Sequence, residues 1–411
     1  MANFRFSARS AEGRTITGTL QAPSPDDAIG QLRGRNMVVL SLQEEKGNVG
    51  KKTPSKAAAA RARVKSEEMV VFTRQMATMV SAGIPVLEAL EILCEQTQNP
   101  GFQAILSQCV ESVRSGMDLS ESMAQHPRAF PKIFVNMVKA GEASGQLDEI
   151  LNRLAEHTHA TAQLKREIKG AMTYPVMSLC MILGITIFLV VFIIPKFQPI
   201  FDALGGVDQL PTPTRILLAT SLFLQSQFHW IVLGSILAIV GIVAYFRTEG
   251  GRLVLDKLML AMPIFGPLFQ KVAISRFART FSTLIESGVP ILGALEIVAS
   301  TIGNRVLEDA VNRAKESIRH GETLAKPLGE TKIFPPMVVK MISIGERSGA
   351  LEMLLKKVSE FYDEQVRATV DGLTSMIEPL LIGVMGFLVG GIVLAVFLPI
   401  FKLQKQMASG G

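Results

Sequence analysis

Two glutamates, Glu142 and Glu346, are the first candidates for functional residues, because they occupy the same place in a repeated motif. The motif is Gly-Glu-x-Ser-Gly-x-Leu, and it begins at Gly141 and again at Gly345. At a helix corner such a carboxylate can contact a partner protein or a second protomer, or bind an oxygen-preferring cation such as Ca²⁺. It can also cap a helix end by accepting backbone N–H bonds. The sequence leaves both roles open and slightly favours capping.

A third carboxylate, Glu378, stands directly against an apolar segment of membrane-spanning length. A charge at membrane depth costs several kcal/mol unless it is paired, so a buried Glu378 would indicate a functional contact. At the membrane boundary this side chain can instead be solvated, or it can pair with Arg367. The first copy of the pattern has Tyr174 at this position, where an interfacial anchor is expected. The two positions therefore need not share a role.

Pro175 and Pro379 follow these two residues at the start of each apolar segment. Proline removes a helix hydrogen bond, so each could form a hinge between a soluble bundle and the membrane. Helix initiation at the bilayer surface explains both prolines equally well.

Nucleophilic and acid–base side chains do not form a recognisable catalytic pattern. The chain has no Gly-x-x-x-x-Gly-Lys-Ser/Thr, His-Glu-x-x-His or Gly-x-Ser-x-Gly motif. Ser178 and Thr186 fall in an apolar segment without a nearby base, which argues against an intramembrane enzyme. We therefore expect no enzyme activity, and any energy that the protein uses must come from a partner.

Metal-binding side chains are also poorly placed for a site. His157 and His159 lie two positions apart, on different faces of a helix. The three cysteines, Cys94, Cys109 and Cys180, match neither a disulfide framework nor a metal-ligand spacing. We expect neither a bound metal nor a cofactor.

The same pattern of residues occurs twice along the chain. The block Phe72–Ile92 returns as Phe277–Ile297, which places Gly83 and Gly288 205 positions apart. The Gly-Glu-x-Ser-Gly-x-Leu motif returns after 204 positions, so the two offsets differ by a single residue. Repeats of this size are domains rather than solenoid units, and we expect two copies of one fold.

Each copy is expected to be an antiparallel bundle of about six short helices, because its apolar residues recur at helical spacing without strand-like alternation. Glycines suited to a left-handed helix end, and prolines suited to the first turn of the next helix, mark the corners. The expected corner residues are Gly83, Pro85, Gly141 and Gly145 in the first copy, and Gly288, Pro290, Gly345 and Gly349 in the second. The last helix of each bundle is expected to continue into the bilayer.

Three uncharged segments are long enough to cross a membrane: residues 171–194, 228–246 and 379–401. As a helix, the first would reach about 36 Å, against a hydrocarbon core of about 30 Å. Lys and Arg are in excess before the first segment and after the second, which predicts that both repeats face the cytoplasm. The middle segment returns the chain to that side before the second copy begins.

The first 45 residues differ from the repeats, because apolar residues such as Phe4 and Phe6 alternate with polar ones and predict strands of a small α+β module. Lys46–Lys65 holds seven basic residues and no carboxylate, which indicates a flexible linker. The expected divisions are the α+β module (1–45), the basic linker (46–65), the first bundle (66–170), the first span (171–195), an extracytoplasmic loop (196–227), the second span (228–246), the second bundle (266–375), the third span (377–401) and a short extracytoplasmic tail (402–411).

Composition supports a protein that is partly embedded in a membrane, and the patterns above predict a mainly α fold. The chain is 48% hydrophobic with a mean hydropathy of +0.33, which is high for a soluble protein. Residues 1–20 lack the continuous apolar core of a signal peptide.

In this order, the motifs resemble those of the PilC/GspF family, the inner-membrane platform proteins of type IV pilus and type II secretion machines. The resemblance covers essentially the whole chain. Its specific parts are Phe-x-Arg…Gly-x-Pro-x-Leu-x-Ala-Leu-Glu at 72–91, the Gly-Glu motif of both copies, Tyr174-Pro175, and Leu-Pro-Ile-Phe at 398–401. The resemblance implies a cytoplasmic hexameric ATPase, pilin or pseudopilin subunits and other inner-membrane assembly proteins as partners. It also implies a bacterial inner-membrane location and a homo-oligomer of two or more copies, with no nucleic acid.

The family resemblance leaves two alternatives to a pilus platform. One is the equivalent platform of a type II secretion system, which assembles pseudopilins. The other is an oligomeric channel or transporter. Proteins of that class typically have polar residues within their spans, whereas these spans are almost purely apolar. The residues around Met172–Pro175 and Leu398–Lys402 favour the pilus machine.

Overall fold

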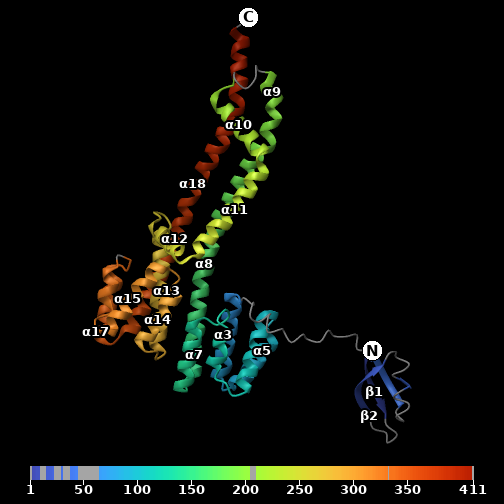
Figure 1. Cartoon of the computed structure of the whole chain (residues 1–411), viewed down its shortest axis with the longest axis vertical. Coiled ribbons are helices and arrows are strands. Elements are labelled where there is room, and N and C mark those ends of the chain that lie inside the picture. The colour runs from blue at the N-terminus through green and yellow to red at the C-terminus, as the bar shows by residue number, and fades with distance from the viewer. Residues whose placement is uncertain are drawn as a thin grey trace.

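The computed structural model describes residues 2–9, 15–22, 29–30, 38–44, 64–203, 210–331 and 333–409. Its helical part consists of two bundles from which long helices extend in one direction (Figure 1). Most of the expected linker, residues 46–63, lies outside the described residues.

The N-terminal module contains a three-stranded antiparallel sheet. Strands β1 (Ala2–Arg9), β2 (Thr15–Ala22) and β3 (Val38–Glu44) lie in the order β2-β1-β3, and a register shift between Ser7 and Ala8 interrupts the β1–β3 pairing. The strands predicted from alternation are therefore confirmed. Between the second and third strands, the structure describes Ile29 and Gly30, and both are helical.

Within the described residues each repeat contains six helices, as its periodicity predicts. The first has α3 (Ser66–Ser81), α4 (Val86–Gln96), α5 (Pro100–Arg114), α6 (Leu119–Ala124), α7 (Lys132–Ser144) and α8 (Leu147–Phe188). The second has α13 (Gly266–Glu286), α14 (Ile291–Thr301), α15 (Arg305–Arg319), α16 (Ala325–Glu330), α17 (Pro336–Ser348) and α18 (Leu351–Ser409).

Buried phenylalanines form the centre of both bundles. In the first, the ring of Phe72 lies 5.4 Å from that of Phe102, and Phe130 and Phe134 complete the cluster. In the second, the ring of Phe277 lies 5.2 Å from that of Phe334. Phe72 and Phe277 begin the repeated Phe-x-Arg blocks, so the motif residue is a core residue in each copy.

Glycines terminate helices at matching corners of the two copies. Gly83 and Gly288 have φ values of 85° and 78°, and Gly145 and Gly349 have values of 70° and 71°. This left-handed conformation is strained for other residues, which explains the glycine at each helix end. Pro85 and Pro290 follow as the N-cap residues of α4 and α14.

Three helical segments among the described residues are long and apolar enough to cross a membrane: Leu147–Phe201, Phe228–Phe246 and Leu351–Phe401. The first and third are continuous with the bundles, because α8 runs for 42 residues and α18 for 59. A short π-helix (Leu189–Ile193) and a 3₁₀ turn (Ile194–Phe197) follow α8, and α9 (Gln198–Ala203) comes next. The second segment belongs to α11 (Phe228–Arg247).

The described residues of the segment expected as an extracytoplasmic loop, 196–203 and 210–227, are largely helical. Helix α10 (Thr212–Ser226) begins after Pro211, with Pro213 in its first turn, where proline is well suited. The hydroxyl of Ser221 donates a hydrogen bond to the carbonyl of Val190 at 2.6 Å, and Leu218 packs in a cluster with Ile194 and Val396. Apolar packing against α18 and the π-helix therefore gives this segment a regular structure.

The third long helix also extends past the expected end of its span. Residues 402–409, expected as a short tail, continue α18.

Candidate functional site

Glu142 and Glu346 cap equivalent short helices. In the first copy, the backbone N–H of Ser120, in the first turn of α6, donates to the carboxylate oxygens of Glu142 at 3.2 and 3.3 Å. In the second, the N–H of Leu324, the N-cap residue of α16, donates to those of Glu346 at 2.9 and 3.1 Å. The structure therefore places both carboxylates in the capping geometry. Within the described residues no group of three or more His, Cys, Asp or Glu could hold a metal ion.

Removing the charge of Glu346 is expected to destabilise the second bundle modestly. Glu346→Gln retains one acceptor oxygen but loses the charge-assisted bond, and lost caps typically cost about 1 kcal/mol. Thermal unfolding of the full chain would measure the loss. Glu364→Gln, a change of the same kind on an exposed face of α18, should leave unfolding unchanged. Equal effects of the two variants would contradict the capping role.

Gly141 and Gly345 lie one turn before the corners, inside α7 and α17. A Cβ atom at Gly141 would lie 3.1 Å from the Cβ of Ile150, and one at Gly345 would lie 2.8 Å from the Cα of Leu351. The repeated glycine therefore allows each of these helices to pack closely on the next. The corner residues themselves are Gly145 and Gly349.

The residues at the start of the apolar spans lie in uninterrupted helices. Helix α8 passes through Pro175, which is buried, while Tyr174 is exposed; α18 passes through Pro379. The prolines therefore do not initiate these helices, which begin at Leu147 and Leu351.

Glu378 is exposed, and it does not pair with Arg367. The two residues are eleven positions apart on one helix, a rise of about 16 Å, which exceeds the reach of their side chains. The Nε atom of Arg367 instead lies 2.8 Å from a carboxylate oxygen of Glu167 on α8. This ion pair joins the two repeats.

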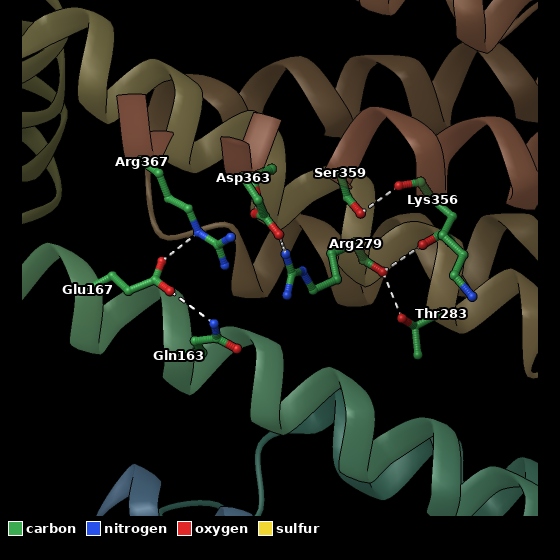
Figure 2. A network of polar contacts seen from close by, with 10 residues as sticks. Gln163, Glu167, Arg279, Thr283, Lys356, Ser359, Asp363 and Arg367 are labelled. Atoms are coloured by element: carbon green, nitrogen blue, oxygen red, sulfur yellow. Dashed lines mark hydrogen bonds and ion pairs between the residues drawn. The ribbon is translucent and has the colours of Figure 1, made fainter. Parts of the chain in front are cut away.

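That pair belongs to a polar seam between the bundles, which we define by Arg153, His157 and Glu167 of α8, Arg279 and Glu286 of α13, and Asp363 and Arg367 of α18. Figure 2 shows Glu167 pointing from α8 towards Arg367, with the side-chain amide of Gln163 donating to Glu167 at 3.0 Å. Arg153 donates to the backbone carbonyl of Glu286. Helix α8 therefore contacts both long helices of the second copy through charged side chains.

A second set of bonds fixes the far wall of the seam within the second bundle. Arg279 pairs with Asp363 (Figure 2). Asp363 also accepts a hydrogen bond from the hydroxyl of Ser275. Lys271 donates to the hydroxyl of Thr369 at 2.8 Å. Burial, followed by the nearby charge of Arg367, lowers the pKa of Arg279. Asp363 compensates the buried charge of Arg279, so this wall holds α13 against α18.

The seam changes character towards the membrane. Leu164 of α8 packs there with Leu268, Val366, Val370 and Leu373 of the second copy. Away from the membrane, a cavity of about 210 Å³ is bordered by polar and charged groups of both bundles. These include Arg153, Glu156, His157, Arg279 and Glu286. The two bundles thus meet through an apolar contact at one end, beside the Glu167–Arg367 pair, and through polar groups around the cavity at the other.

Lowering the pH is expected to destabilise the seam through His157. Burial, and then the charge of Arg279, lower the pKa of His157 from 6.5 to about 4. The unfolded chain therefore takes up this proton at higher pH than the folded chain does. The contribution, at most about 3 kcal/mol, is complete above pH 6.5 and falls as the pH drops towards 4.

Thermal unfolding of the wild type and of His157→Gln across this pH range would check the prediction. The wild type should lose more stability on acidification than the variant does. The same pH dependence in both proteins would contradict it.

Only a partial signal for this seam is present in the sequence. Arg279 is the arginine of the repeated Phe-x-Arg motif, but its counterpart Arg74 is exposed in the first copy. Asp363 corresponds by the 204-residue offset to His159, which cannot provide the same carboxylate. Equivalent positions of the two copies therefore have different roles. The ion pairs across the seam join one copy to the other, so comparing the two copies in sequence does not reveal them.

Two homologous helical bundles on long apolar helices define a membrane scaffold built by duplication. The chain belongs to the family described as type II secretion system (T2SS), protein F: the family's model matches residues 72–195 and 277–399, and its N-terminal domain matches residues 1–43. Each longer match covers one bundle with its membrane segment. The resemblance inferred from the motifs is confirmed.

The chain is similar over nearly its whole length to named proteins of this family. The type IV pilus assembly protein PilC of Myxococcus xanthus is 38% identical over 403 residues, 98% of this chain and 95% of that protein. PilC of Thermus thermophilus is 39% identical over 408 residues, 97% and 98% of the two chains. The type II secretion system protein F of Vibrio cholerae is 31% identical over 411 residues, 99% and 100%. With its three apolar helices, this is a multi-pass membrane protein of the pilus and secretion family.

Proposed function

We propose that this chain is the inner-membrane platform of a type IV pilus assembly machine. It couples a cytoplasmic hexameric ATPase to the insertion of pilin subunits into a filament. It is not itself an enzyme and takes its energy from the ATPase. The two relatives named type IV pilus assembly protein PilC, which match nearly the whole chain, support this proposal.

The observation that carries the proposal is the continuity of α8 and α18 from the bundles into the apolar spans. A movement of either bundle is passed along an unbroken helix to the membrane. The bundles are proposed to shift relative to each other across the seam, so that both the apolar contact around Leu164 and Leu268 and the neighbouring Glu167–Arg367 pair rearrange. Breaking the pair costs little, because half-exposed ion pairs such as Glu167–Arg367 contribute only about 0–1 kcal/mol.

The proposed orientation places the N-terminus and both bundles in the bacterial cytoplasm. Excess Lys and Arg stay on that side of a membrane. Basic residues flank the bundle ends of the first two spans, and they include Lys165, Arg166, Lys169, Arg252 and Lys257. Helix α10, at the other end of the spans, contains a single charged residue, Arg215.

Partner contacts in the membrane are proposed for the exposed apolar helices. Gly383, Gly386 and Gly390 of α18 face open space, where another helix can approach closely. A second copy of the chain and pilin subunits are the proposed partners there. Tyr174 and Glu378, exposed at the bundle ends of two spans, are proposed to contact the same partners.

The equivalent platform of a type II secretion system is the second candidate. The full-length match to protein F of Vibrio cholerae favours it, although the identity of 31% is lower than that of the PilC relatives. A channel is disfavoured, because the segment 171–194 carries no charged residue with which to line a pore.

Gene deletion followed by complementation with the full chain would test the proposal. Surface filaments counted by electron microscopy should disappear on deletion and return on complementation, while protein secretion continues. Loss of secretion with normal filaments would favour the secretion platform instead. If neither filaments nor secretion changed, the proposal would be wrong. Co-purification of the full chain with its ATPase would test the coupling partner separately.

A further inference from the structure

Helix α12 (Glu249–Ala261) exposes apolar residues beside charged ones on its outward side, although Leu260 packs inward against the core. Val254 and Leu258 are 50% and 58% exposed, and Ile264, just beyond the helix, is 48% exposed. Surface helices of soluble bundles direct such residues inward. An outward apolar side therefore suggests that the surroundings of α12 are not water alone.

The inward side of α12 is fixed by a buried carboxylate. Asp256 is only 7% exposed, and it accepts the backbone N–H of Arg305 at 2.7 Å. Arg305 begins α15, so Asp256 binds the positive end of that helix. This contact holds α12 on the second bundle and determines which of its sides faces outward.

The position of α12 coincides with the level at which the chain enters the membrane. Helix α12 starts two residues after α11 ends at Arg247, and Thr248 between them caps it. Phe265, at the corner after α12, and Leu268, in the first turn of α13, pack in one apolar cluster. The same cluster contains Ala171 and Leu373. Ala171 begins the uncharged first span, and Leu373 lies just before the third. Figure 1 shows α12 at the junction of the second bundle with the long helices.

We propose that α12 is an interfacial helix that lies in the headgroup region of the bilayer, with Val254 and Leu258 directed towards the acyl chains. Amphipathic helices of this kind bury their apolar side about 5–10 Å into the boundary between headgroups and acyl chains. The exposed side chains of Arg252 and Lys257 are available to lipid headgroups. The occupant of this surface is the lipid itself rather than a protein partner.

The alternative geometry, a re-entrant or broken span, is disfavoured by the contacts of both helices. Helices α12 and α13 are bent by 111° relative to each other. Helix α13 contributes Phe277 and Phe281 to the core of the second bundle, and Asp256 ties α12 to α15. Insertion of α12 to membrane depth would break the Asp256 contact and bury a carboxylate in lipid, which is costly.

The lipid contact belongs to the second copy alone. By the 205-residue offset, α12 corresponds to the sequence Glu44–Lys56, which has no amphipathic apolar pattern. The second bundle is therefore held at the bilayer surface by a contact that the first bundle lacks. This asymmetry makes the first bundle the more mobile partner across the seam.

Depth-dependent fluorescence quenching of the full chain in lipid vesicles would test the proposal. The chain has a single tryptophan, Trp230, so Trp230→Phe with Leu258→Trp reports on α12 alone. The matched control is Ile344→Trp in the same background, because Ile344 is also an exposed apolar residue, at 54%. Ile344 lies in α17, next to Gly345, which packs against Leu351 at the start of α18. Leu351 lies about 33 Å along α18 from Leu373, so the control position is far from the membrane end of the bundle.

A nitroxide on the lipid near the headgroup should quench Leu258→Trp strongly, and one deep in the acyl chain should quench it less. The emission of Ile344→Trp should respond to neither lipid and be quenched by aqueous iodide. Stronger quenching of Leu258→Trp by the deep probe would overturn the proposal in favour of insertion. No lipid quenching, with full access to iodide, would overturn it in favour of a solvent-exposed helix. Unfolding temperatures would verify that both variants are folded.

Discussion

Replacing Gly345 by alanine should destabilise the second bundle by about 2–3 kcal/mol, the upper part of the range for overpacked sites. The added Cβ would lie 2.8 Å from the Cα of Leu351, a distance that real Cβ atoms essentially never adopt. The obstacle is backbone at the start of α18, which cannot rotate away as a side chain can. Helices α17 and α18 would have to separate. Limited proteolysis and thermal unfolding of the full chain would measure the effect.

Two matched glycines make this prediction specific. Gly372→Ala, in the middle of α18 with open space around it, should stabilise the chain slightly, because alanine favours a helix more than glycine does. Gly141→Ala should have an intermediate effect, since its nearest neighbour is the Ile150 side chain at 3.1 Å. If Gly345→Ala were as stable as Gly372→Ala, the close helix contact would be refuted.

The features that the sequence predicted are those with local causes. Gly83, Gly145, Gly288 and Gly349 could be assigned to helix ends because a left-handed backbone conformation is a property of single residues. Helical periodicity likewise predicted the six-helix bundles, and uninterrupted apolar composition predicted the spans. Duplication strengthened each of these inferences, because every local signal occurred twice.

The features that the sequence did not predict depend on contacts between distant elements. Glu167 and Arg367 each look like an ordinary solvated helix residue, and their pairing follows only from how the bundles dock. For Glu378, solvation and pairing with Arg367 were both left open; the side chain is exposed, and eleven positions of continuous helix keep it from Arg367. The segment of α10 was expected as a loop because its packing partner α18 lies far away in sequence.

Linking the two bundles across the seam should abolish filament assembly. The proposed platform works by relative movement of α8 and α18, so a covalent link between positions 167 and 367 removes that movement. Breaking the ion pair alone, for example with Glu167→Gln, should have little effect on stability, because both side chains are partly exposed. If function is lost when the bundles are linked but kept when the ion pair is broken, filament assembly requires relative movement of the bundles rather than the stability that the pair contributes.

The design uses Glu167→Cys and Arg367→Cys in a chain whose three native cysteines are replaced. A reducible bis-maleimide is preferred to a direct disulfide, because these long side chains meet at their tips and a disulfide requires close Cα atoms. The matched control links Lys357→Cys to Glu360→Cys, two exposed positions three residues apart on α18. That link has the same chemistry but joins no two bundles.

The most direct test of the coupling mechanism is the number of surface filaments formed by cells whose platform is fully linked across the seam. We expect filaments to be lost on linking, to return after reduction of the linker, and to be unaffected by the control link within α18. A normal number of filaments with the seam linked to completion would contradict movement between the bundles as the coupling step.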